Sequence, residues 1–161
     1  MQGEREREAV PCHQKGEEGP EMISQNNGKF RIETQKYACY GFSLLWWAWY
    51  KNNLVLSHDM IDHKLYYLWQ KKEWMTETWW IKNPVAIAQW LGLDVTQVTK
   101  ESPTFRPRKT DIIIGQWKAD SFSHFVPMSH ERAVRYDPWF SPEGGSSAVR
   151  RGKLMSYRIL R

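Results

Sequence analysis

Cysteine is scarce in this 161-residue chain, which argues against a small disulfide-stabilised fold. Cys12 lies in a polar segment and Cys39 in an apolar one, so we expect no disulfide between them, as in a reducing cytoplasm. Long apolar runs are also missing. The longest, residues 38–50, is too short to span a bilayer, and residues 1–30 lack the apolar core of a signal peptide. We therefore expect a cytoplasmic protein that does not enter the membrane.

Aromatic side chains, in contrast, are abundant. They make up 14% of the chain and include 10 tryptophans, and hydrophobic residues account for 41%, a composition that indicates a packed interior. Residues 1–29 differ, because they are rich in Glu, Gln, Gly and Asn and show no sustained apolar periodicity. We therefore predict a disordered leader at residues 1–29 and a single, monomeric domain at residues 30–161.

The hydrophobic pattern divides residues 30–161 into a helical part and an extended part. After an extended entry at residues 29–34, the pattern predicts helices at residues 39–50, 57–70 and 83–92, with Ser57 as a cap and Pro84 in a first turn. Beyond Gly92 the pattern is typical of strands, which we predict at residues 95–98, 111–117, 122–127, 133–137 and 154–160. Helices followed by strands favour an α+β fold with a mainly antiparallel sheet.

Three residues occur in the order nucleophile, base and orienting carboxylate. Cys39 would lie in the first turn of a buried helix, where free backbone N–H groups lower the pKa of a thiol. His124 would lie on a strand facing that turn, and Asp137 on the next strand could accept its other ring N–H. Gln35, four residues before Cys39, is the candidate side-chain donor to an oxyanion. This pattern indicates a thiol hydrolase.

The same residues resemble the papain-like cysteine peptidases, and among them the branch of bacteriocin-processing peptidase domains. The resemblance extends over about residues 30–161 and is closest to small proteins of bacteria, phages and plasmids. The matching segments are Gln35-Lys36-Tyr37-Ala38-Cys39-Tyr40, Asn83-Pro84, Ser123-His124-Phe125-Val126, Tyr136-Asp137-Pro138-Trp139 and Gly152-Lys153-Leu154-Met155-Ser156-Tyr157-Arg158.

This resemblance implies a papain-like fold, in which the nucleophile lies on a central helix that packs on the antiparallel sheet. It also implies a nucleophile at Cys39, a general base at His124, an orienting carboxylate at Asp137 and an oxyanion donor at Gln35. The substrate would be a peptide or protein, although the same chemistry would serve an amidase, a deamidase or an acyl transferase. No cofactor and no metal ion would be needed.

The charge distribution leaves a second hypothesis open. Residues 100–161 contain twelve Lys and Arg against six Asp and Glu, whereas residues 1–29 contain four against six. Together with the many tryptophans, this basic part would suit an inactive papain-like module that binds a host protein or, less favoured, nucleic acid. His58 and Asp62 share one helical face, but two possible ligands without a third indicate a surface ion cluster rather than a metal site.

Overall fold

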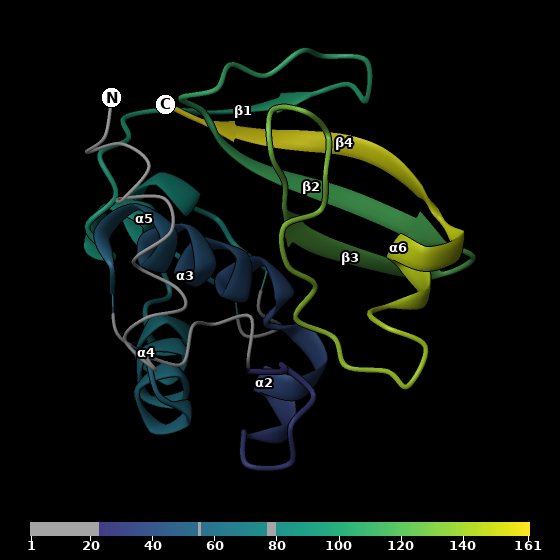
Figure 1. Cartoon of the computed structure of the whole chain (residues 1–161). Helices are drawn as coiled ribbons and strands as arrows, with labels where there is room; N and C mark the ends of the chain where they lie inside the picture. The colour runs from purple at the N-terminus through teal and green to yellow at the C-terminus, as the bar shows by residue number, and fades with distance from the viewer. Residues whose placement is uncertain (1–22, 55, 77–79) are drawn as a thin grey trace, which may run out of the picture.

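In the computed structural model, which describes residues 23–54, 56–76 and 80–161, helices precede an antiparallel sheet (Figure 1). The helices are α2 (Ile32–Tyr37), α3 (Cys39–Asn52), α4 (His58–Gln70), α5 (Pro84–Trp90) and α6 (Ser147–Arg151). The strands are β1 (Val98–Glu101), β2 (Ile112–Ala119), β3 (Phe122–Pro127) and β4 (Lys153–Leu160). They form one four-stranded sheet in the order β1-β4-β2-β3, and all neighbours are antiparallel. The predicted α+β class is confirmed.

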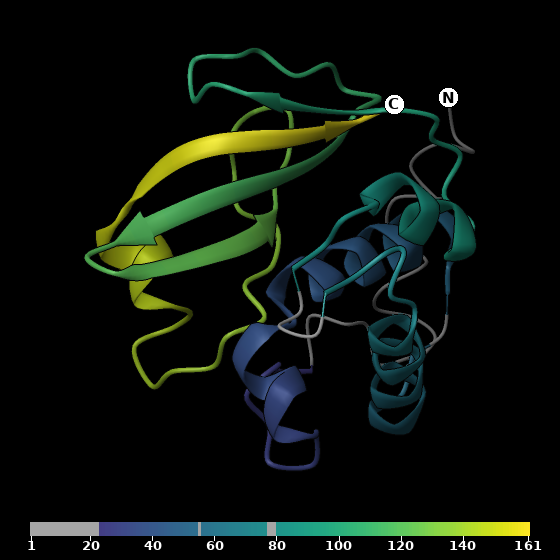
Figure 2. The same ribbon diagram turned by 180° about the vertical axis from the view of Figure 1, so that it is seen from behind.

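Helix α3 is the central helix of the fold. It lies between α4 and α5 on one side and the sheet on the other, as both views show (Figures 1 and 2). Every residue from Tyr40 to Trp49 is buried, because this stretch is apolar on all faces. The Nε1–H group of Trp47 donates a hydrogen bond to the carbonyl oxygen of Ile113 on β2 over 2.9 Å, so the buried indole has no unsatisfied donor. The packing therefore fixes both ends of α3 relative to the sheet.

The predicted helix caps are present. The Ser57 hydroxyl accepts a hydrogen bond from the backbone N–H group of Met60, and the Asn83 side chain accepts one from that of Ala86, with Pro84 in the first turn. Both helices therefore begin where local side-chain chemistry indicated. None of the helices in the described part of the chain is long and apolar enough to cross a membrane.

The strand prediction at residues 133–137 is wrong. Here the chain makes a single isolated bridge, between Met128 and Val134, and runs on without further pairing. It leaves the sheet because Arg132 adopts a left-handed backbone conformation, with φ 71°, and because Tyr136 packs inward and donates its hydroxyl to the carbonyl oxygen of Ile23. The bounds predicted for the first strand are also wrong, because β1 begins at Val98 rather than at residue 95. Helix α6 was not predicted.

The N-terminal segment also differs from the prediction. Residues 32–34 belong to a helix rather than to an extended entry, and residues 23–27 are buried or partly buried against the domain. Ile23 and Gln25 are buried, and the Gln25 backbone N–H group donates to the carbonyl oxygen of Pro138 over 2.6 Å. The domain therefore begins earlier than residue 30. The rest of the predicted leader, residues 1–22, lies outside the described residues.

Candidate active site

Cys39 is the first residue of α3. One residue, Ala38, separates α3 from α2, so the chain bends there and the N–H groups of the first turn of α3 have no helical acceptor before them. Cys39 is a free thiol, and the backbone of Tyr40 and of Phe125 hydrogen-bonds to it. The positive end of the helix dipole acts at the same place. Backbone donors therefore surround the sulfur from two elements that are distant in sequence.

His124 connects the thiol to a carboxylate. It lies on β3, which packs against α3, and its side chain is only 1% exposed. Its Nε2 atom lies 2.7 Å from Oδ1 of Asp137, and its ring also hydrogen-bonds to Cys39. Because Nε2 is engaged by Asp137, Nδ1 is the nitrogen that faces the thiol. The structure thus brings Cys39, His124 and Asp137 together as predicted, even though Asp137 does not lie on a strand.

Asp137 is fixed by four donors. Its Oδ1 atom accepts from His124 and from the backbone N–H group of Trp139 at 3.0 Å. Its Oδ2 atom accepts from the backbone N–H group and from the hydroxyl of Ser146, both at 2.8 Å. A carboxylate bonded in this way cannot rotate away from the imidazole without breaking several charge-assisted hydrogen bonds. Ser146 and the turn before it are therefore part of the site, although the sequence analysis did not identify them.

The electrostatic environment favours an ion pair between thiolate and imidazolium. Burial opposes charge on all three side chains, but their mutual contacts reverse its effect. The pKa of Cys39 falls below its ordinary value because His124 donates a hydrogen bond to the sulfur and carries positive charge. The pKa of His124 rises to about 9, against the effect of burial, through its hydrogen bonds to Asp137 and Cys39, and that of Asp137 is lowered. These interactions favour the charged form of the sulfur, which is the nucleophilic form of a cysteine.

Gln35 is not brought together with these three residues. The side-chain amide of Gln35 donates to the backbone carbonyl oxygen of Phe30 over 2.7 Å. The backbone carbonyl oxygen of Gln35 accepts a hydrogen bond from the side-chain amide of Gln25. The amide of Gln35 thus holds the N-terminal segment against α2. In this arrangement the backbone N–H groups around Cys39 are better placed than Gln35 to stabilise an oxyanion.

Cys39 opens onto a cleft of about 570 Å³ between the helices and one face of the sheet, whereas His124 and Asp137 lie behind it. The aromatic residues that line this cleft include Tyr37 and Trp80, and Trp80 is 67% exposed. A cleft of this size holds several residues of an extended peptide. Its lining is formed by Lys36, Tyr37, Cys39, Tyr40, Trp80, Ile81, Pro84, Val98, Thr99, Lys100, Gln116, Ser123, Phe125 and Arg158.

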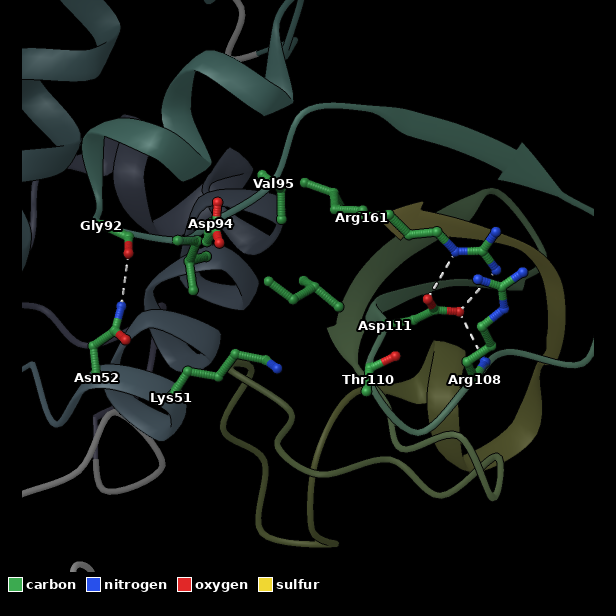
Figure 3. Close-up of a pocket in the computed structure, with 12 residues that line it drawn as sticks. Lys51, Asn52, Gly92, Asp94, Val95, Arg108, Thr110, Asp111 and Arg161 are labelled. Atoms are coloured by element: carbon green, nitrogen blue, oxygen red, sulfur yellow. Dashed lines mark hydrogen bonds and ion pairs between the residues drawn. The ribbon is translucent and has the colours of Figure 1, made fainter.

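A second cavity, of about 420 Å³, lies at the other end of α3 (Figure 3). Arg161 crosses it to form two hydrogen bonds with Asp111, at 2.8 and 3.0 Å, and Asp111 also accepts from the backbone N–H group of Arg108. No cysteine lies among the described residues that line it. His58 contacts Asn27, and Asp62 pairs with Arg31. The described residues include no group of three or more His, Cys, Asp or Glu side chains that could hold a metal ion.

A substitution at Gly145 tests how Asp137 is held. Gly145 has φ +80°, and a Cβ atom there would lie 2.9 Å from Oδ2 of Asp137. Gly145→Ala is therefore expected to lower the free energy of unfolding by about 1–2 kcal/mol and to reduce turnover at least tenfold, because the carboxylate must shift. Gly144→Ala is the matched control, since Gly144 has φ +87° and nothing within 4 Å of such a Cβ. Equal loss of turnover in both variants would contradict this role.

Residues 22–161 match the family model described as "Protein of unknown function, DUF261". The α+β domain with its aligned cysteine, histidine and aspartate therefore belongs to this family. No curated protein and no solved structure matches the chain.

Proposed function

We propose that this protein is a papain-like thiol hydrolase that cleaves an amide bond in a peptide or protein. One observation carries the proposal: Cys39, at the N-terminus of a buried helix, is hydrogen-bonded to His124, whose far nitrogen lies 2.7 Å from Asp137. A buried cysteine serving only the core would have neither an imidazole partner nor a cleft in front of its sulfur.

The proposed reaction has two steps. The thiolate of Cys39 attacks the carbonyl carbon, and backbone N–H groups of the first turn of α3 stabilise the oxyanion. The imidazolium of His124 gives its proton to the leaving amine, the C–N bond breaks, and a thioester forms. Water then attacks the thioester while His124 takes its proton. The C–S bond breaks, the acid is released, and Cys39 returns to the thiolate form beside a protonated His124.

A catalytically inactive interaction module is the second candidate. Trp80 and Phe140, which are 67% and 64% exposed, favour this candidate, because exposed aromatic residues are enriched at binding surfaces. The two candidates differ in their response to loss of the thiol. A binding module would keep its affinity for a partner in Cys39→Ser, whereas a hydrolase would lose turnover.

The proposed function is tested with a proteome-derived peptide library and mass spectrometry of new termini. The intact protein is expected to generate a reproducible set of cleavages, and Cys39→Ser is expected to reduce them at least a thousandfold, because a serine alcohol at this site remains protonated. Cys12→Ser is the matched control for the second thiol of the chain and should retain full activity. Cleavages that persist in Cys39→Ser would refute the proposal.

A further inference from the structure

The lining of the cleft in front of Cys39 is unbalanced in charge. It includes Lys36, Lys100 and Arg158, and none of the described residues that line it is acidic. The second cavity contrasts with it, because there Asp94 and Asp111 accompany the cations, and Arg161 is already bonded to a carboxylate (Figure 3). Positive charge without a counter-charge thus distinguishes the cleft that contains the thiol from this second cavity.

Two of these cations face each other across the sheet. Lys100 on β1 is the direct neighbour of Arg158 on β4 in the strand register, so both side chains point to the same face. Like charges in directly opposed positions destabilise a sheet. Among the described residues, Arg158 donates hydrogen bonds only to neutral acceptors, on Ser156, Tyr157 and Gln116. An anion between the two side chains would relieve this repulsion.

A third residue of the lining, Tyr40, carries a hydroxyl group without an acceptor in the described part of the chain. Tyr40, directly after Cys39, is 9% exposed, and its buried hydroxyl has no hydrogen-bond partner among the described residues. Burial raises the pKa of this phenol far above its usual range, so it remains a donor. Its ring lies 4.9 Å from that of Phe125, and the guanidinium of Arg158 lies 5.5 Å from the same ring. A buried hydroxyl without a partner costs free energy that a bound acceptor would offset.

We infer that this cleft binds a carboxylate of the substrate, which accepts a hydrogen bond from Tyr40 and pairs with Arg158 and Lys100. That this carboxylate lies beside the bond that Cys39 attacks rests on the proposed function. That the cleft binds a carboxylate does not depend on the proposed function. The carboxylate comes either from an Asp or Glu side chain or from a free C-terminus. The protein would therefore select peptides that carry a carboxylate close to the bond that Cys39 attacks.

The inference is tested with two alkylating reagents of similar size, iodoacetate and iodoacetamide. The rates of Cys39 alkylation by the two reagents are measured at pH 6 by peptide mass spectrometry. The rate with iodoacetate is divided by the rate with iodoacetamide, and this ratio is divided by the same ratio measured for glutathione. We expect this corrected ratio to exceed one. It should fall about three- to tenfold in Arg158→Gln and about twofold to threefold in Tyr40→Phe, and it should fall in high salt.

Two control variants isolate the subsite. Arg158→Lys keeps the charge and should keep most of the ratio, and Lys109→Gln removes an exposed cation that does not line the cleft and should leave it unchanged. His124, which also attracts anions, is present in every variant. An unchanged ratio in folded Arg158→Gln and Tyr40→Phe overturns the carboxylate subsite. Slow reaction of iodoacetamide at every pH overturns the proposed function instead, so the two failures are distinguishable.

Protection experiments identify the source of the carboxylate. Short peptides that contain Glu, with an amidated C-terminus, are compared with their Gln counterparts and with the same Gln peptides carrying a free C-terminus, as inhibitors of iodoacetamide labelling. Stronger protection by the Glu peptides assigns the site to an acidic side chain, and stronger protection by the free C-terminus assigns it to a terminal carboxylate. Equal protection by all three, or stronger and salt-dependent protection by single-stranded DNA, overturns the inference.

Discussion

His124→Gln is expected to slow alkylation of Cys39 at pH 6 by roughly a hundredfold and to abolish hydrolysis. Burial raises the pKa of the thiol in the native protein, but the hydrogen bond and the positive charge of His124, together with the backbone donors of Phe125 and Tyr40, lower it by more. Without His124 only burial and the backbone donors remain, so the thiol is protonated at pH 6. Glutamine keeps a polar group beside Asp137 and so limits the loss of stability.

His130→Gln is the matched control, because His130 is a partly exposed histidine outside the site. It should leave both the alkylation rate and turnover unchanged. The measurement is the rate of iodoacetamide incorporation at the Cys39 peptide between pH 5 and pH 9, with circular dichroism to verify the fold. A variant that is folded and still alkylated at the native rate would exclude an ion pair with His124.

Asp137→Asn is expected to lower kcat/KM by about 10²- to 10⁴-fold. Asp137 raises the pKa of His124 and fixes which ring nitrogen faces Cys39. The side-chain amide of the Asp137→Asn variant would carry no negative charge. Its N–H group would also face a backbone N–H group, of Trp139 or Ser146, that donates to the carboxylate in the native protein. The pKa of His124 should therefore fall from about 9, and the alkaline limb of the pH–rate profile should move to lower pH.

The sign of this shift distinguishes an orienting carboxylate from a purely structural one. Below the pKa of His124 the imidazolium can protonate the leaving amine, and above it this proton is lost, so the rate falls as the pH rises. Asp120→Asn, which removes a charge from an exposed turn residue, should leave the profile unchanged. A drop in turnover without movement of the alkaline limb would assign Asp137 a structural role only.

Helices α3, α4 and α5 could be predicted because their signals are local. Ser57 and Asn83 cap their helices through backbone groups only three residues away, and the apolar run after Cys39 can only form a buried element. β3 was likewise predicted with its observed bounds, Phe122–Pro127. The order of Cys39, His124 and Asp137, together with the resemblance of these segments to papain-like peptidases, then predicted that the three residues meet.

Features that depend on tertiary contacts could not be predicted in this way. The segment around Asp137 has the composition of a strand, but it leaves the sheet because Tyr136 packs toward Ile23. Gln35 has the residue type of an oxyanion donor, but its amide is used by Phe30. Pairing of Lys100 with Arg158 depends on the register of two strands that are distant in sequence, and no local pattern specifies that register.

The pH dependence of Cys39 alkylation in the native protein tests the central claim most directly. With iodoacetamide and mass spectrometry of the Cys39 peptide, the ion pair predicts a rate that is already high at pH 6 and stays nearly constant up to about pH 9, where His124 loses its proton. A rate that is negligible at pH 6 and rises tenfold per pH unit toward pH 9 would show an ordinary buried thiol. That result would contradict the assignment of Cys39 as a nucleophile.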